Sequence, residues 1–160
     1  MQGIFEDMDW LGIAFETQAR IQSEHMDDYR AALGRLDAMG LLYKCTCPRS
    51  QLAAAQGVKT APDGSPIYPQ TCRLHGVREG VPFALRLKMD EAAARLSEPL
   101  ELNGVRSDPS VWGDVILARK DTGASYHLAV VVDDALQGVT HVARGRDLGH
   151  RNGGGARTRG

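Results

Sequence analysis

A chain of 160 residues is long enough to bury a core as one domain, without disulfide bonds to hold it together. Its hydrophobic fraction of 42%, charged fraction of 24% and net charge of −1 exclude collagen-like, disordered and strongly basic proteins. No apolar run approaches the roughly 20 residues that cross a bilayer, and acidic residues lie where a signal peptide would be basic, so we expect a cytoplasmic protein.

The first half of the chain predicts two helices. The clearer one spans residues 23–40, with Ser23 as the N-cap and Gly40 as the left-handed stop. Its apolar residues recur at helical spacing: Met26, Tyr29, Leu33 and Leu36. A shorter helix is predicted over 51–56, after Pro48 in a first-turn position.

The second half predicts mostly strands. Residues 83–89 alternate apolar and polar side chains, which is the period of a half-buried strand, and residues 115–117 form a buried apolar run. The stretch 126–132 fits either a strand or a buried helix, because periodicity cannot decide over so few residues. A further strand is predicted over 139–143, and the Gly- and Arg-rich stretch 149–160 is expected to be disordered.

The three cysteines predict a metal site. Cys45 and Cys47 lie two residues apart, so an extended backbone projects both thiols to one side, at a spacing too tight for an easy mutual disulfide. Cys72 follows a Pro/Gly-rich loop long enough to fold back, which brings a third soft ligand for tetrahedral zinc. Ligand chemistry alone nominates His75 as the fourth ligand, whereas Tyr68 is chemically rarer. The alternative is three free thiols in a reducing cytosol.

Five segments together carry a resemblance to a known family. Two lie near the C-terminal end, residues 125–134 and 137–148, and they accompany Tyr43-x-Cys45-x-Cys47, the stretch 68–73 and Trp112-x-Asp114. In this order and at these spacings, they resemble the glutamyl-tRNA synthetase family of class I synthetases. The resemblance is strongest to the branch of that family that glutamylates the queuosine base of tRNA(Asp) and lacks an anticodon-binding domain.

The resemblance, which covers the chain up to Leu148, implies a fold, an activity and a set of ligands. The fold would be α/β, a partial class I Rossmann-type catalytic domain with a zinc-bearing insertion. The activity would be ATP-dependent activation of L-glutamate and its transfer to tRNA(Asp), with zinc, and ATP with magnesium in the full-length family. The zinc ligands would be Cys45, Cys47, Tyr68 and Cys72, so the family favours Tyr68 over the histidine that ligand chemistry nominates.

The same resemblance implies that Tyr126 and Arg144 bind L-glutamate. A guanidinium can fork onto a carboxylate, and a phenol adds a directional hydrogen bond beside it. The alternatives are a core aromatic for Tyr126 and a surface salt bridge for Arg144. The adjacent acids Asp133 and Asp134 seldom converge on one atom, so we expect a helix-surface or capping role for them, and core packing for Trp112.

The resemblance divides the chain at residues 40, 111 and 148. It implies part of the catalytic domain over 1–40, a zinc-bearing acceptor-binding insertion over 41–111, the second half of the catalytic domain over 112–148 and a Gly/Arg tail over 149–160. Neither the HIGH-type nor the KMSKS-type motif of the ATP site occurs in the 160 residues. We therefore expect a monomeric internal fragment with no catalytic residues of its own and no activity alone.

Two other interpretations stay open at this stage. An ordinary glutamyl-tRNA synthetase would share these motifs and would continue into an anticodon-binding domain. A zinc-stabilised RNA-binding or interaction module without catalysis would explain the missing ATP-site motifs. Arginines cluster in the last 17 residues, but the preceding body is net acidic and contains no basic stripe typical of a nucleic-acid surface.

Overall fold

The computed structural model describes residues 2–14, 20–48, 50–51, 59–98, 100–102 and 105–142. Its helices are α1 (Gln2–Trp10), α2 (Met26–Ala38), α4 (Thr71–His75), α5 (Met89–Ala93) and α6 (Tyr126–Leu136), with short 3-10 helices η1 (Gln22–Glu24) and η2 (Pro109–Trp112). Its strands are β1 (Leu42–Cys45), β2 (Ala84–Leu87), β3 (Leu100–Leu102), β4 (Val105–Ser107) and β5 (Ile116–Ala118). Among the described residues, no helix has the length and hydropathy needed to span a membrane.

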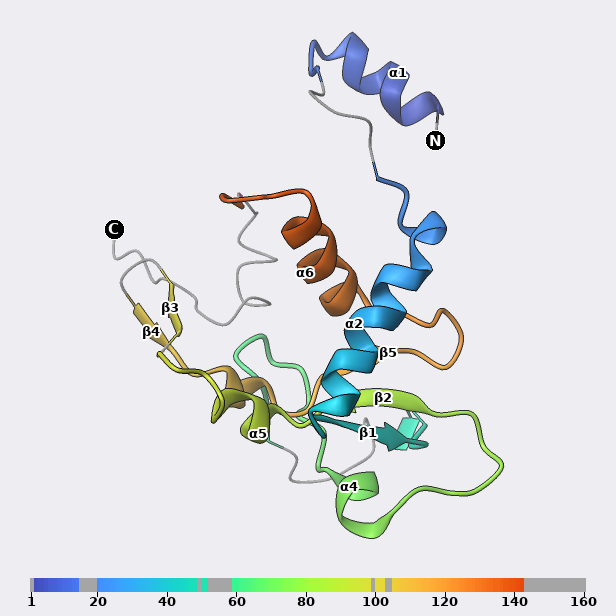
Figure 1. Ribbon diagram of the computed structural model, residues 1–160, viewed down its shortest axis with the longest axis vertical. Coiled ribbons are helices and arrows are strands. Elements are labelled where there is room, and N and C mark those ends of the chain that lie inside the picture. Colours follow the sequence, from blue (N-terminus) through green and yellow to red (C-terminus); the bar gives the residue numbers. More distant parts are fainter. Residues whose placement is uncertain are drawn as a thin grey trace.

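A three-stranded antiparallel sheet with the order β1-β2-β5 organises the described residues. The β1–β2 ladder runs from Leu42 opposite Leu87 to Cys45 opposite Ala84, and the β2–β5 register shifts next to Arg86. The strands β3 and β4 form a separate two-stranded antiparallel sheet. The helix α4 packs against β1, the strand that ends at Cys45 (Figure 1).

The hydrophobic core lies between the sheet and two helices. The helices α2 and α6 contact each other, and they also contact β1 and β5 respectively (Figure 1). The buried members of this core are Tyr29, Ala32, Leu33, Leu42, Leu117, Ala118, Leu128 and Ala129. The helix α1 lies apart from these elements (Figure 1). Because the core joins residues from both halves of the chain, it fixes the sheet that carries the candidate site.

The helix predicted over 23–40 forms, but it begins later than expected. Residue Met26 is its first residue, and Ser23 lies in the preceding 3-10 turn with no capping hydrogen bond from a side chain to α2. The Gln22 side chain in that turn instead donates to Asp133 on α6. The predicted stop is confirmed, since Gly40 has φ +72°, a backbone conformation that glycine adopts at no steric cost.

The ambiguous stretch 126–132 is a helix. The Ser125 side chain caps α6, with its hydroxyl oxygen accepting from the backbone N–H of Leu128 at 3.3 Å. The strand predicted over 139–143 is wrong for residues 139–142, which form no strand because α6 runs to Leu136 and the chain then turns at Gly138. Residue 143, the tail 149–160 and most of the helix predicted over 51–56 lie outside the described residues.

The strand predicted over 83–89 is confirmed as β2, but its burial differs from the expected alternation. Ala84 and Arg86 are buried, whereas Leu85 and Leu87 are half-buried against the hydrophobic core. Both faces of β2 are therefore covered, one by the helical core and the other by the cysteine-bearing side. The alternation of apolar and polar residues in a strand cannot reveal that both of its faces are covered.

The expected helix-surface role of Asp133 is wrong. Asp133 is only 6% exposed. Its carboxylate accepts hydrogen bonds from the Tyr29 hydroxyl at 2.8 and 2.9 Å, from Arg20 Nε at 2.8 Å and from Gln22 Nε2 at 3.1 Å. Burial raises the pKa of Asp133, but these donors outweigh it and lower the pKa below its ordinary value. The Asp133 carboxylate thus joins α6 to α2 and to the segment that precedes α2.

The Asp133→Asn substitution is expected to lower the free energy of unfolding at pH 7 by about 1–3 kcal/mol, because a buried hydrogen-bonded charge is lost. A depressed native pKa stabilises the fold above the unfolded pKa of about 3.9, and the contribution disappears as pH falls through the native value. The difference between the two proteins should therefore shrink below about pH 4 in urea unfolding. Asp134→Asn, one residue along, is the control, and a difference independent of pH would contradict the assignment.

Candidate metal centre

Three thiols meet where β1 ends and α4 begins. The Sγ atoms of Cys45, Cys47 and Cys72 all lie within 4.8 Å of one another, and those of Cys47 and Cys72 are 3.4 Å apart. Cys45 and Cys72 are buried, and none of the three forms a disulfide. Zinc–sulfur distances of about 2.3 Å in tetrahedral geometry hold the sulfurs about 3.8 Å apart, so these separations fit a three-thiolate zinc site.

The Tyr68 phenol completes this cluster. Its oxygen lies 3.4 Å from Cys47 Sγ and accepts from the backbone N–H of Cys72 at 2.8 Å. Gln70 adopts a left-handed conformation with φ 58° between Tyr68 and α4, which turns the chain back on itself. His75, at the exposed end of α4, is not part of the cluster. The structure thus places the phenol, and not the imidazole, beside the three thiols.

The cluster favours the thiolate form of Cys72. Burial raises the pKa of this thiol, but hydrogen bonds from Tyr68 and from the backbone N–H of Thr46, 3.4 Å from Sγ, outweigh burial and lower the pKa to about 6. Burial raises the pKa of the Cys47 thiol instead. Because the thiolate is the form that binds metal, a soft divalent cation such as zinc suits this donor set.

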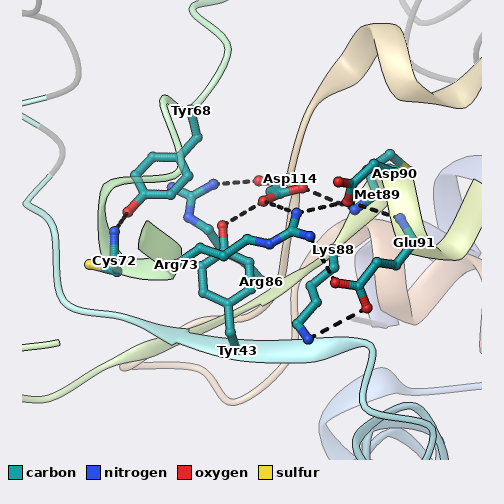
Figure 2. Close-up of polar contacts among 10 residues, drawn as sticks. All are labelled: Tyr43, Tyr68, Cys72, Arg73, Arg86, Lys88, Met89, Asp90, Glu91 and Asp114. Carbon is teal, nitrogen blue, oxygen red and sulfur yellow. Dashed lines mark hydrogen bonds and ion pairs between the residues drawn. The ribbon is translucent and has the colours of Figure 1, made fainter. Parts of the chain in front are cut away.

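A buried carboxylate lies behind the cluster. Asp114 is 2% exposed, and its carboxylate accepts from the Tyr43 hydroxyl at 2.8 Å and from the backbone N–H of Met89 at 2.9 Å (Figure 2). The guanidinium of Arg73 lies 3.5 Å from the same carboxylate. Asp114 thereby connects the start of β5 with β1, α4 and α5.

Arg73 holds α4 against α5. It directly follows Cys72, and its guanidinium forms ion pairs with Asp90 at 2.7 Å and Glu91 at 2.8 Å (Figure 2). The hydrogen bond between Arg73 and Asp90 raises the pKa of the guanidinium and lowers that of the carboxyl, and burial only partly opposes both shifts. The backbone around Cys72 is therefore fixed from outside the cluster as well as within it.

Arg86 links the backbone of Asp114 to the ring of Tyr68. It points from β2 to the cysteine-bearing side, donates from Nη1 to the backbone oxygen of Asp114 at 2.6 Å, and places Cζ 3.8 Å from the centroid of the Tyr68 ring. Sequence reasoning assigned no role to Arg86, Arg73 or Asp114. The last two lie in the segments that carry the family resemblance, whereas Arg86 gives no signal beyond its polar position in a strand.

Of the two residues expected to bind glutamate, the structure describes Tyr126. Tyr126 is the first residue of α6 and is 48% exposed, with its ring edge-on to that of His127. Arg144 lies outside the described residues, so its role stays a prediction. Trp112 lies half-buried in η2, and its Nε1 has no hydrogen-bond partner among the described residues, so its expected packing role stays a prediction.

Comparison with known families identifies this fold. Residues 1–153 match the family model "tRNA synthetases class I (E and Q), catalytic domain". The chain belongs to this family. Its membership confirms the predicted α/β class I catalytic fold.

Two relatives are similar over most of the chain, and both are named glutamyl-Q tRNA(Asp) synthetase. The protein of Rhodobacter capsulatus is 42% identical over 164 residues, covering 91% of this chain and 58% of the relative. That of Deinococcus radiodurans is 43% identical over 145 residues, covering 89% of this chain and 48% of the relative. The chain therefore spans about half the length of these relatives.

A solved structure shares the fold at lower sequence identity. The glutamate tRNA ligase of Elizabethkingia meningosepticum, crystallised in complex with its amino acid, superposes with a TM-score of 0.65 at 20% identity. The match covers 92% of this chain and 34% of that chain. At this identity the similarity shows the fold alone.

Proposed function

We propose that this chain is part of a ligase that activates L-glutamate with ATP and transfers it to the queuosine base of tRNA(Asp). The observation that carries the proposal is the cluster of three thiols and one phenol, formed by the residues to which the resemblance assigns zinc. The names of the two relatives support the choice of tRNA(Asp), and the family supports glutamate, ATP and tRNA as substrates. A monomeric state and a cytoplasmic location are part of the same proposal.

In this proposal, Cys45, Cys47, Tyr68 and Cys72 hold one zinc ion. When bound, the ion supplies a structural cross-link between the end of β1 and α4. The residues 41–111 then form an acceptor-binding insertion stiffened at that point, followed by the second half of the catalytic domain over 112–148. The sheet crosses this proposed boundary, because β5 pairs with β2.

Tyr126 and Arg144 are proposed to bind L-glutamate. The guanidinium would pair with a carboxylate and the phenol would orient it by a hydrogen bond. The ATP of class I synthetases, with its magnesium, is held by motifs that do not occur in the 160 residues. We therefore propose that this chain alone is inactive, because adenylation needs the triphosphate and the glutamate carboxylate held in line.

A transfer assay tests the function. Radiolabelled glutamate, ATP and queuosine-bearing tRNA(Asp) are incubated with this chain and with a chain extended by the two ATP-site motifs. Transfer is expected only with the extended chain, and Arg144→Ala is expected to reduce it by about 10²-fold or more, the scale of a lost transition-state contact. Lys120→Ala, in an exposed turn, is the matched control.

Three results would contradict parts of the proposal. Transfer by the 160-residue chain would mean that other residues hold ATP. Charging of tRNA(Glu) in place of tRNA(Asp) would identify an ordinary glutamyl-tRNA synthetase. Binding of tRNA by the extended chain without any transfer would favour a non-catalytic RNA-binding module.

A further inference from the structure

We infer that Arg86 is a positioning residue for the metal site, holding the Tyr68 phenol toward the thiols and balancing their negative charge. The inference rests on the proposed zinc site. It assigns a function to a buried arginine that the proposed reaction does not use.

The first observation is that Arg86 is buried without an ion-pair partner among the described residues. Arg86 is only 5% exposed, and it takes part in none of the ion pairs among the described residues. Its Nε has no hydrogen-bond partner among those residues. A buried charge is costly unless opposite charge or polar groups lie close to it. Among the described residues, Arg86 donates a hydrogen bond to the carbonyl of Asp114 and lies over the ring face of Tyr68.

The second observation is the negative charge of the proposed zinc site, which the Tyr68 phenol completes. One zinc ion with three thiolates carries a net charge of −1, and a tyrosinate as the fourth ligand makes it −2. The phenol oxygen that meets these thiols belongs to the ring under Arg86 (Figure 2). The guanidinium is therefore the buried positive charge placed to balance the loaded site through the Tyr68 ring.

The third observation is the geometry of the contact. A guanidinium is planar, and at 3.8 Å from the ring centroid it contacts the ring face of Tyr68. Its other end is fixed by the 2.6 Å hydrogen bond to the Asp114 carbonyl. The ring therefore cannot swing away from the thiols without losing this contact. A lysine would keep the charge but lose the planar contact and the forked donor.

A double-mutant cycle on zinc affinity tests the inference. Zinc affinity is measured by competition with a chelator for the wild type, Arg86→Met, Tyr68→Phe and the double variant. Arg86→Met is expected to weaken binding by about 10–100-fold, as loss of a partner of a metal ligand does. The losses of the two single variants should not add fully in the double variant, because Arg86 acts in part through the Tyr68 phenol. Arg95→Met, at an exposed arginine, is the control and should bind as the wild type does.

A spectroscopic readout separates positioning from a general effect on folding. Zinc loading of the wild type is expected to produce a near-ultraviolet tyrosinate band from Tyr68, and this band should be reduced in Arg86→Met. If that variant does not fold, Arg86→Lys is measured in the same way and should show a smaller band and weaker affinity than the wild type.

The experiments distinguish a failure of this inference from a failure of the proposed zinc site. Wild-type affinity and an undiminished band in the folded Arg86 variant would overturn the inference alone, and so would losses that add fully in the double variant. Absence of zinc binding by the wild type would overturn the proposed metal site and the inference with it.

Discussion

Replacing Cys72 by serine is expected to abolish zinc binding. The wild type, purified without chelator, should contain about one zinc per chain, the number that one tetrahedral site holds. The Cys72 sulfur lies next to Cys47 Sγ and the Tyr68 hydroxyl, and its low pKa supplies a thiolate at neutral pH. A serine hydroxyl stays protonated and is a poor ligand for a soft site. Metal analysis should find less than about a tenth of a zinc per chain, and zinc should no longer raise the melting temperature.

Two further substitutions decide the fourth ligand. Tyr68→Phe removes the phenol oxygen beside the thiols and should weaken zinc binding, whereas His75→Ala should leave it unchanged. Loss of zinc in His75→Ala alone would show that the family assignment is wrong at this position. A zinc-free wild type with all three thiols titratable in the folded state would reject the metal site itself.

Replacing Asp114 by alanine is expected to lower the free energy of unfolding by about 3–5 kcal/mol, the cost of removing one partner from a buried charged network. The Tyr43 hydroxyl and the Met89 N–H would be left buried without an acceptor, and Arg73 would lose one of its carboxylates. Burial and the bond to Asp114 already raise the pKa of Tyr43, so this phenol stays a neutral donor. Urea unfolding in saturating zinc, followed by circular dichroism, measures the loss.

Asp108→Ala is the matched control. Asp108 is exposed and caps η2 by accepting from the backbone N–H of Ser110 at 2.9 Å, so its loss should cost about 1 kcal/mol. Asp114→Asn, which keeps one acceptor oxygen but no charge, should fall between the two alanine variants. Equal losses in Asp114→Ala and Asp108→Ala would show that the buried network contributes nothing beyond an ordinary cap.

The metal site shows how far spacing alone can lead. The pair Cys45 and Cys47 and the returning Cys72 predict a shared ligand set, because thiols two residues apart project to one side of an extended chain. Spacing and ligand chemistry nominate His75 over Tyr68, although either residue can lie within reach of Cys72. The left-handed turn at Gln70 and the direction of α4 separate them, by turning the phenol inward and leaving the imidazole in solvent.

For secondary structure as well, local sequence decides some elements and tertiary packing decides others. The apolar period within 23–40 and the stop at Gly40 are local properties, so the sequence determined α2 apart from its first turn. The sequence alone also determined the family, through motifs in a fixed order. It could not decide between strand and helix for 126–132, because a run of valines fits either; the Ser125 cap and the packing of α6 on α2 decided it.

Long-range partners were decided only by the tertiary structure. The sequence predicts a surface acid at Asp133, beside Asp134, and a residue on the polar face of a strand at Arg86. Nothing near either residue in the sequence reveals its partners. Tyr29 lies 104 residues from Asp133, and Asp114 lies 28 residues from Arg86. A buried charge is stable only where distant segments supply its donors and acceptors, and only folding brings those segments together.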